Sequence, residues 1–556
     1  MSKILFVLLI LPLVVISQNI NYEYTSNGVY SKSNVVDSEG NHFVVGGFKG
    51  YTNFLDDSTN NVFISKPNNM GTSMDSYIIK FANDGEVDWI KTFGGDSKDN
   101  AISVILGNDN SIYVSGWFED EIVLFDGTVF NTTGITGTYL LKIDSNNGNL
   151  IWGRDFKDGV RSAPNGITLD NNTGEVILID SYAMTSYGYD FYRLNPNSGD
   201  IVFQRYINLG GDFLNVQTDN YGNTYFTVND MQSFSLDGVS LTGPSFSNAI
   251  IVKLDSEFKC VGGLNLGTPK TDGVSELKIN PINNDIYVSV IFGTGEVNVN
   301  PYGENTTVYG DCGFFGIYGN DFLLKSFHTY IGSVFHQGMA NVENITFDKN
   351  FQNITLFGNI SNSSQDIDFK FGDGEINTNI GKSFFSTYSL NDNFEHKITS
   401  FINYSGNDGT NTTERSVWLH VNDYIISSDF GYNLSFYDQN SNLLYNNIGD
   451  RTDSSSSRNT AYSTVASLDY GNTLSLNYDL LEEVSDEMKL YPNPFNDIVN
   501  VKTNNKVNKI TVFNLSGEIL LKSINRTVVD TSKLNSGIYL FKVETGYNSK
   551  FFKLIK

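Results

Sequence analysis

The chain has 556 residues, of which 13% are aromatic and 18% charged, and its formal net charge is −26. This acidity argues against partners such as nucleic acid or anionic lipid, because both attract clustered Lys and Arg. Phe (40 residues) and Tyr (31 residues), together with abundant Asn, Ser, Thr and Gly, favour pleated strands and tight turns over helices. The composition therefore predicts an all-β protein.

The N-terminus has the pattern of a secretory signal peptide. Lys3 precedes an apolar run from Ile4 to Ile16, and the polar Ser17-Gln18-Asn19 follows. The run is short for a membrane span but has the length of a signal-peptide apolar region. We predict residues 1–18 as the signal peptide, with cleavage near Ser17 or Gln18. No other stretch is long and apolar enough to predict a transmembrane segment.

A β-hairpin recurs along residues 19–480, the predicted repeat domain. Its clearest copies run from Asp75 to Gly95 and from Gly137 to Phe156. Both contain an apolar run, a Lys, a turn of Asn, Asp and Gly, and a second apolar run with Trp89 or Trp152 at the same place. This equivalence indicates packing between repeats rather than stacking on sugars. Weaker copies begin at Tyr189, Asn248, Phe314, Ser383 and Asn433, and the period-two alternation predicts a hairpin for each.

A second hairpin precedes each of these copies. The second set begins at Asn34, Ala101, Asn165, Leu214, Val274, Val342 and Val417. Two hairpins make a four-stranded unit. The repetition of such units roughly every 60 residues predicts a β-propeller. Residues Ser463 to Leu480 resemble a first hairpin again, and Ile20 to Tyr24 align with a last strand. Two counts therefore stay open: seven blades with a trailing strand pair, or eight with one blade built from both ends.

Inserts of differing length lie between the two hairpins of several units. The longer ones span Tyr51 to Ser73, Glu121 to Gly137, Gly295 to Gly313 and Gln365 to Lys382. Because they occupy one slot of the repeat, we expect them on one face or rim, with partners bound there or in the adjacent channel mouth. We also expect that shortening them leaves the melting temperature nearly unchanged.

One succession of motifs resembles a known repeat family. Gly116-Trp117-Phe118, an insert with Phe125-Asp126-Gly127-Thr128, and the hairpin from Thr138 to Trp152 resemble the bacterial SBBP-type β-propeller repeat. The resemblance is strongest in the first two units and fades along the chain. It implies the propeller fold.

The pattern changes after the predicted linker at 481–487. Residues 488–556 form a run of short alternating segments with turns at Ser516-Gly517 and Ser536-Gly537, which predicts a small Ig-like antiparallel sandwich. From Ser485 onward there are eleven Lys and Arg and six Asp and Glu, a net +5, so the remainder carries −31. This change of sign supports a domain boundary.

The last domain opens with two closely spaced prolines, which restrict the backbone and remove amide donors. It resembles the type A C-terminal sorting domain of type IX secretion, found in Bacteroidetes. The matching residues are Tyr491, Pro492, Asn493, Pro494, Val512-Phe513-Asn514, Gly517, Leu534, Ser536, Gly537, Ile538, Tyr539 and Phe552 to Ile555. The resemblance implies that the secretion machinery is a partner, that the domain is cut off in the linker, and that the protein is released or attached to the outer surface.

Motifs for catalysis and metal binding are missing from the sequence. There is no HExxH, GxSxG or phosphate loop, and the histidines, which we interpret as ordinary strand residues, have no metal-ligand spacing: His42, His328, His336, His396 and His420. The Asp-rich turns at Asp144, Asp170 and Phe371 lack a complete calcium loop and are interpreted as hairpin turns. We predict no catalytic, metal or cofactor-binding residue, and calcium is the one cofactor candidate.

Three residue pairs were considered as sites. Asp366/Asp368 and Glu119/Glu121 have the type of residue that glycosidases use, but such pairs arise by chance among 62 acidic residues. Cys260 and Cys312 lie in adjacent units, and export would permit a disulfide between them.

Two function classes remain. The preferred one is a secreted or cell-surface binding module with a glycan or protein ligand in the central channel or on the inserts. The alternative is an extracellular carbohydrate-active or other hydrolytic enzyme on the same scaffold. Asp, Glu, His or Tyr residues converging at the channel mouth would favour the enzyme, and an apolar or evenly polar channel would favour binding.

Overall fold

The structure is a computed structural model that divides into two compact units, residues 1–473 and 474–556. It describes residues 18–470 and 489–556 except 28, 50–51, 54–62, 65–72, 84–86, 157–161, 184–186, 209, 245–247, 271, 331–339, 349–350, 361–365, 368, 370–375, 378–382, 391–393, 406–416, 421–422, 431–432, 439–442, 449–461, 504–505, 515–518, 525, 536 and 546–548. The predicted signal peptide and linker lie outside the described residues, and the predicted domain boundaries stay predictions.

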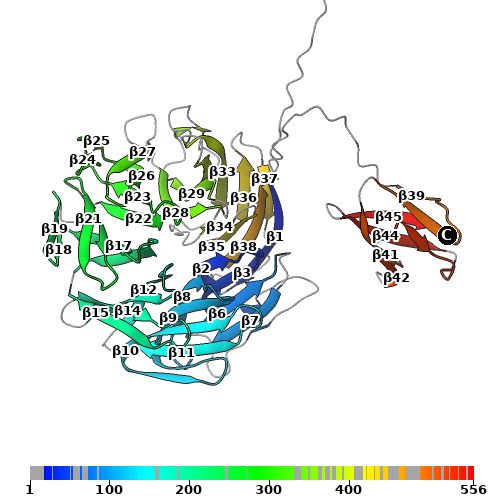
Figure 1. Ribbon diagram of the computed structural model, residues 1–556, viewed down its shortest axis with the longest axis horizontal. Helices are drawn as coiled ribbons and strands as arrows, with labels where there is room; N and C mark the ends of the chain where they lie inside the picture. Colours follow the sequence, from blue (N-terminus) through cyan, green and yellow to red (C-terminus); the bar gives the residue numbers. More distant parts are fainter. Residues whose placement is uncertain are drawn as a thin grey trace, which may run out of the picture. The chain divides into compact units, whose positions relative to one another are not determined.

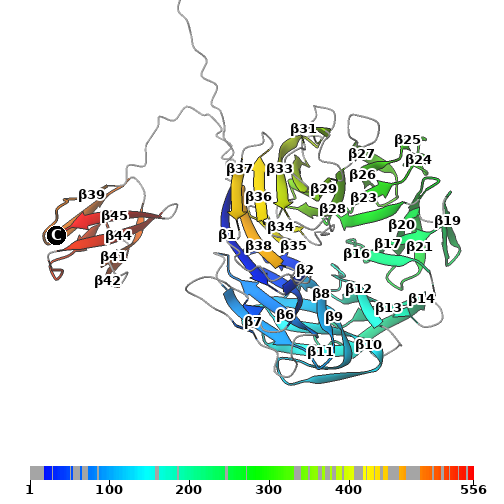
Figure 2. The same ribbon diagram turned by 180° about the vertical axis from the view of Figure 1, so that it is seen from behind.

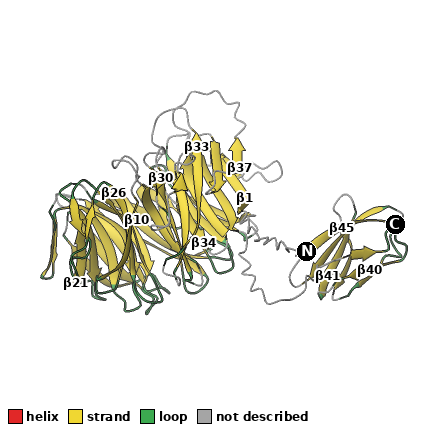
Figure 3. Ribbon diagram, turned by 90° about the horizontal axis from the view of Figure 1, so that it is seen from above, coloured by secondary structure: helices red, strands yellow, loops and turns green. Residues whose placement is uncertain are grey.

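The first unit is a ring of antiparallel sheets, which confirms the all-β propeller prediction (Figure 1). Figure 3 shows only strands and loops in its described parts. The first three sheets contain β2 (Val29–Val36), β3 (His42–Lys49), β6 (Met74–Phe81) and β7 (Val87–Phe93); β8 (Asp99–Leu106), β9 (Ser111–Val123), β10 (Val129–Asp144) and β11 (Leu150–Phe156); and β12 (Ser162–Leu169), β13 (Val176–Ala183), β14 (Tyr187–Leu194) and β15 (Ile201–Ile207).

The next three sheets repeat this order from the ring centre outward (Figure 2). They contain β16 (Asp212–Thr218), β17 (Thr224–Met231), β20 (Asn248–Leu254) and β21 (Cys260–Leu266); β22 (Gly273–Ile279), β23 (Ile286–Phe292), β26 (Cys312–Tyr318) and β27 (Leu324–Tyr330); and β28 (Ala340–Phe347), β29 (Asn353–Ile360), β32 (Ser383–Ser389) and β33 (His396–Ser405). Each sheet is thus two successive hairpins, as the repeat predicts.

The seventh sheet of the described chain joins its two ends. Its order is β1 (Gln18–Asn27), β38 (Tyr462–Tyr470), β35 (Asp423–Phe430) and β34 (Val417–His420). β1 pairs with β38 over nine residue pairs, from Gln18↔Tyr470 to Asn27↔Tyr462. The expected match between the N-terminal segment and a last strand is confirmed. These strands share one sheet with β34 and β35, however, so they do not form an additional blade.

The hairpin that begins at Asn433 corrects the predicted seventh unit. Its strands β36 (Asn433–Asp438) and β37 (Leu443–Ile448) do not pair with β35. Instead β36 pairs with β33, from Ser400↔Asp438 to Ser405↔Asn433, and extends the sixth sheet to six strands. The pairing that the repeat predicted is taken by β38, whose eight pairs with β35 leave no free edge there for β36.

The apolar core lies between neighbouring sheets. One buried cluster joins the first and second sheets through Val45, Ile78, Val114 and Leu141, and comparable clusters fill the following four junctions. A sheet therefore buries both faces, which explains why its middle strands read as continuous apolar runs rather than as strict alternation.

The turn between the third and fourth strands of a sheet packs against the preceding sheet. Trp89 donates through Nε1 to the carbonyl oxygen of Ser145 at 3.2 Å, and Trp152 donates to that of Pro196 at 3.0 Å. Each indole lies over a turn glycine with positive φ, Gly148 or Gly199, where a Cβ would come within 3.0 Å of the ring. The predicted packing role of the two tryptophans is confirmed.

In later sheets, phenylalanine residues of the corresponding turn pack against the preceding sheet. Phe258, Phe322 and Phe394 occupy the corresponding turns with φ between 55° and 65°. Phe258 lies 5.9 Å from Phe203 of the preceding sheet, and Gly262 leaves room for Phe322. Positive φ is costly for a bulky residue, so the buried ring contacts must offset that strain.

The inserts contribute to the core, contrary to expectation. Phe234 on β18 (Ser233–Leu236) and Leu241 on β19 (Val239–Thr242) are buried in the junction of the third and fourth sheets. Val297 on β24 (Glu296–Asn298) and Val308 on β25 (Thr307–Tyr309) are buried in the next junction. The remaining insert strands are β4 (Thr52–Asn53), β5 (Phe63–Ile64), β30 (Asp366–Ile367) and β31 (Ile376–Asn377). Shortening such an insert exposes apolar side chains, so we now expect it to lower the melting temperature.

Substituting Phe234 by Ala tests this role. Phe234 is fully buried, and removing its ring should lower the free energy of unfolding by about 3–5 kcal/mol. Urea unfolding followed by tryptophan fluorescence measures the change. Tyr221→Ala is the control, because Tyr221 is 68% exposed and its loss should change stability little. Equal stability of both variants would show that the insert is an appendage.

The second unit contains two antiparallel sheets. One consists of β39 (Lys489–Tyr491), β40 (Ile498–Lys502) and β43 (Val528–Asp530), and the other of β42 (Ile519–Ile524), β41 (Val507–Phe513), β44 (Ile538–Thr545) and β45 (Ser549–Ile555). Val499, Ile510, Val512 and Phe541 are fully buried in a core that both sheets share. The Ig-like topology of this domain stays a prediction.

Candidate functional site

The innermost strands of six sheets carry a β-bulge at the same place. The ladder irregularities fall between Ser31 and Ser33, Ala101 and Ser103, Pro164 and Gly166, Leu214 and Gln217, Val274 and Glu276, and Val342 and Asn344. A bulge leaves one residue outside the ladder and redirects its side chain. Four of the unpaired residues, Lys32, Asn215, Ser275 and Glu343, lie at one level of the channel and line the same space.

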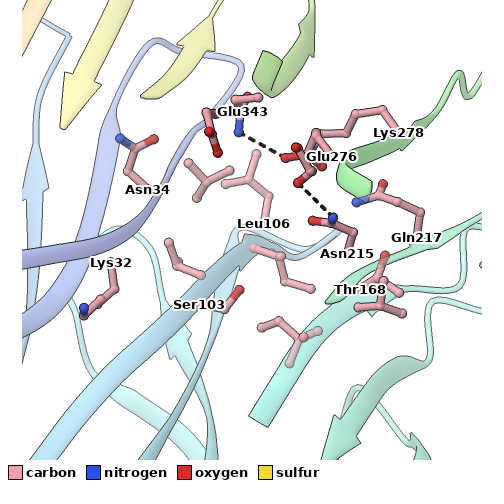
Figure 4. A pocket seen from close by; sticks show the side chains of 18 of the residues that line it. Lys32, Asn34, Ser103, Leu106, Thr168, Asn215, Gln217, Glu276, Lys278 and Glu343 are labelled. Atoms are coloured by element: carbon pink, nitrogen blue, oxygen red, sulfur yellow. Dashed lines mark hydrogen bonds and ion pairs between the residues drawn. The ribbon is translucent and has the colours of Figure 1, made fainter. Parts of the chain in front are cut away.

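A cavity of about 540 Å³ occupies this level (Figure 4). It falls within the usual range of small-molecule sites, about 300–1,000 Å³. Its polar lining is Lys32, Asn34, Ser103, Thr168, Asn215, Gln217, Ser275, Glu276, Lys278, Glu343 and Asn344, and its apolar lining includes Val35, Ile105, Leu106, Ile167, Val216 and Phe357. The polar groups come from all six strands, and apolar side chains lie between them.

Two carboxylates belong to neighbouring strands of this wall. Burial raises the pKa of Glu276, and Lys278, whose Nζ lies 3.7 Å from Oε1, partly opposes that rise. The negative charge of Glu343 raises the pKa of Glu276 further. Burial also raises the pKa of Glu343, against hydrogen bonds from Asn341 and Asn359. Both carboxyl groups are thus held in surroundings that disfavour their ionised forms.

Amides hold these carboxyl groups in place. Asn344 donates through Nδ2 to Oε2 of Glu276 at 3.4 Å, and Asn341 donates to Oε1 of Glu343 at 2.6 Å. Asn215, whose φ is 53°, donates to the carbonyl oxygen of Ser275 at 3.1 Å and so links two bulges. Figure 4 shows Glu276 and Glu343 on one wall and Lys32 on another.

Some buried polar atoms of the wall have no hydrogen-bond partner within the described structure. They are Oδ1 of Asn344 and both polar atoms of the Asn34 side chain. The two residues are 6% and 1% exposed. Buried polar groups are nearly always paired in native proteins, and an exception calls for an explanation such as an ion or ligand.

The pKa of Glu276 gives a pH-dependent prediction. The unfolded chain releases this proton near the ordinary value of 4.5 and the folded chain only at higher pH. The free energy of unfolding should therefore fall as pH rises from 4.5 through the raised pKa. Glu276→Gln should remove this loss and be more stable at pH 7 by on the order of 1 kcal/mol. Urea unfolding of both proteins at pH 4.5, 6 and 7 measures it, and parallel pH profiles would contradict it.

The predicted sorting motif is gathered around the last residues of the chain. Asn493 accepts a hydrogen bond at Oδ1 from the Ile555 amide at 2.9 Å, and Phe495 donates its amide to the Ile555 carbonyl at 2.8 Å. Gly537 exchanges two backbone hydrogen bonds with Lys556. The motif segment therefore lies along the free side of β45, opposite β44.

The other motif residues differ in their surroundings. Tyr539 is buried against Phe495 and donates to the carbonyl oxygen of Asn535 at 2.7 Å. Tyr491, Pro492 and Pro494 are exposed, and both prolines follow cis peptide bonds. Gly517 lies outside the described residues.

Substitutions at Asn493 test its role in holding β45. Asn493→Ala removes the acceptor for the Ile555 amide and should accelerate hydrogen exchange of that amide, corresponding to a loss of about 1 kcal/mol. Asn493→Asp keeps the acceptor and should preserve most of the protection. Lys502→Ala, at an exposed position of β40, is the neutral control. Unchanged exchange in Asn493→Ala would rule out this contact as an anchor.

The candidate disulfide between Cys260 and Cys312 is not formed. Both thiols are free and buried, in different core clusters. Cys260 pairs with Leu254 beside the β20–β21 turn, whereas Cys312 pairs with Phe292 at the insert end of the next sheet. A seven-residue strand separates these ends by roughly 20 Å, far beyond the Cα distance of about 7 Å that a disulfide spans.

None of the remaining candidates is among the described residues that line the cavity. His42 is buried on β3, His396 contacts Thr399 at 2.8 Å, His328 lies on β27 and His420 on β34, while His336 and Asp368 lie outside the described residues. Glu119 and Glu121 lie on the outer part of β9, and Asp366 on β30. No group of three or more His, Cys, Asp or Glu within the described ranges is arranged to hold a metal.

In the two Asp-rich turns that the structure describes, the Asp side chain accepts a backbone amide, as is common in hairpin turns. Asp144 accepts the Asn146 amide at 2.8 Å, and Asp170 accepts the Asn172 amide at 2.9 Å. Asp170 also pairs with Arg193 at 2.6 Å. The turn at Phe371 lies outside the described residues.

The sequence reading did not identify the cavity residues. Glu276, Glu343 and Asn344 occur in predicted first strands, but a bulge changes which face a residue occupies, and strict alternation misplaces them. A signal was present in Glu276 and Asn344, which are polar residues at the same register of two neighbouring repeats.

Comparison with known protein families identifies the C-terminal domain of the chain. Residues 489–556 match the family model described as the secretion system C-terminal sorting domain, which confirms the resemblance in this part of the chain. No curated protein sequence matches the chain. The protein is therefore secreted or attached to the cell surface, with the secretion machinery as a partner of its last domain. Within the described residues no helix has the length and apolar character needed to cross a membrane.

Solved structures are similar only at low identity. A quinohemoprotein alcohol dehydrogenase from Comamonas testosteroni is 10% identical, with a TM-score of 0.37 over 87% of this chain and 80% of that chain. An apocarotenoid oxygenase from Synechocystis is 9% identical, with a TM-score of 0.34 over 80% and 92%. A protein of unknown function from Bacteroides caccae is 16% identical, with a TM-score of 0.22 over 43% and 82%. Such values carry no inference about ligands.

Proposed function

We propose that this exported propeller is a binding module whose ligand, a small polar molecule or the end of a glycan, occupies the central channel. The observation that carries the proposal is the bulge-lined cavity, in which polar side chains from six strands face one space. Buried polar atoms of the same wall, Asn344 Oδ1 among them, have no partner in the described structure, and such atoms call for an explanation.

The chemistry of the wall supports binding over hydrolysis. Amides, hydroxyls, two carboxylates and two ammonium groups are distributed around the cavity, and no His or Tyr is among its described lining residues. Glu276 and Glu343 lie on one wall without a His or Tyr beside them in the described lining, which supports a binding role. Two carboxyl groups alone do not define a hydrolase, because a nucleophile or general acid must also meet a substrate bond.

A glycan and metabolite array tests the proposal with the secreted protein. Ser103→Trp should fill part of the cavity and weaken binding at least tenfold, because Ser103 lines it. Ser198→Trp, at an exposed turn, is the matched control and should bind like the wild type. Ligands retained by Ser103→Trp would place binding elsewhere, and an array without any hit would reject the proposed function. Product analysis of each hit distinguishes binding from hydrolysis.

A further inference from the structure

The two carboxylates of the channel differ in how their charge is balanced. Glu276 has Lys278 at 3.7 Å on its own strand, and its side chain is 8% exposed. Glu343 has amide donors, Asn341 at 2.6 Å among them, but no ion pair with a side chain that the structure describes. Glu343 is half-buried and its burial raises its pKa, so ionising it without a cation nearby costs free energy.

The surroundings of Glu343 are also rich in acceptors. Asn344 directs Nδ2 to Glu276, and its Oδ1 is buried and without a partner in the described structure. Glu276 and Glu343 add carboxylate oxygens. A ligand that complements this wall must therefore donate several hydrogen bonds from one place, and it gains most if it carries positive charge.

We propose that the wall formed by Glu276, Glu343 and Asn344 binds the ammonium group of a small organic amine. This inference rests on the proposed function and names the ligand class for the same cavity. A primary ammonium has three donors and no acceptor, which fits the carboxylate oxygens of Glu276 and Glu343. It also provides the positive charge that Glu343 otherwise lacks.

Two other ligand classes fit the wall less well. Calcium prefers six to eight oxygen ligands, and only two carboxylates converge on the described wall. A neutral polyol supplies donors but leaves the charge of Glu343 unbalanced. Both become outcomes of the test.

The test compares amines with their hydroxyl analogues by calorimetric titration of the secreted protein. The pairs are glucosamine with glucose and 1,4-diaminobutane with 1,4-butanediol. The amine of at least one pair should bind at least tenfold more tightly than its analogue. Glu343→Gln should abolish that difference and should also resist unfolding at pH 7 better than the wild type. Glu257→Gln is the matched control, because Glu257 is exposed and paired with Lys259.

Equal binding of amine and alcohol, or an amine preference that persists in Glu343→Gln, would overturn the proposal. So would binding of calcium chloride that is lost in Glu343→Gln while the amines do not compete. If none of the amines binds up to about 10 mM while the array yields a channel ligand without an amine, the inference fails and the proposed function stands. If the array also yields none, both fail.

Discussion

The propeller depends on the pairing of its first strand with its last. Nine residue pairs join Gln18–Asn27 to Tyr462–Tyr470, and no other described ladder brings together segments so distant in the sequence. Joining them has a large entropic cost that the local hairpins do not share. Ring closure has a geometric consequence, because only a closed ring holds the innermost strands at the fixed separation that defines the cavity. The cavity therefore depends on an intact last sheet, although β1 and β38 do not contribute to its described lining.

Local patterning was sufficient to predict most sheets from the sequence. The hairpin around Trp89 and the one around Trp152 combine period-two alternation with turn residues, and both are determined by neighbours in the chain. The hairpin at Asn433 shares that pattern, yet it extends the sixth sheet. Its own residues determine that it is a hairpin, but the strand beside it is chosen by competition with β38. Such competition depends on the whole ring and is not visible in any one segment.

The burial of the insert hairpins was not predicted for a similar reason. Phe234 and Val297 alternate with polar residues as surface hairpins do, and their burial depends on the neighbouring sheet that they cover. Likewise, the bulges that build the cavity are recognisable only once the partner strand is known. The export signal was easier to read because Asn493, Gly537 and Tyr539 act within one short domain, where motif and structure lie in the same segment.

The bulges also separate two roles that a strand normally combines, which are pairing within the sheet and forming the channel wall. A residue within a regular ladder cannot change its character without affecting the core or the adjacent sheet, whereas Lys32, Ser275 and Glu343 stand outside the ladder. Their replacement alters the channel wall and leaves the apolar clusters between the sheets in place. A ring of this kind can acquire new ligands through single substitutions while its folding is preserved. Related propellers with the same sheets and different bulge residues would then form a repertoire of receptors on a common frame.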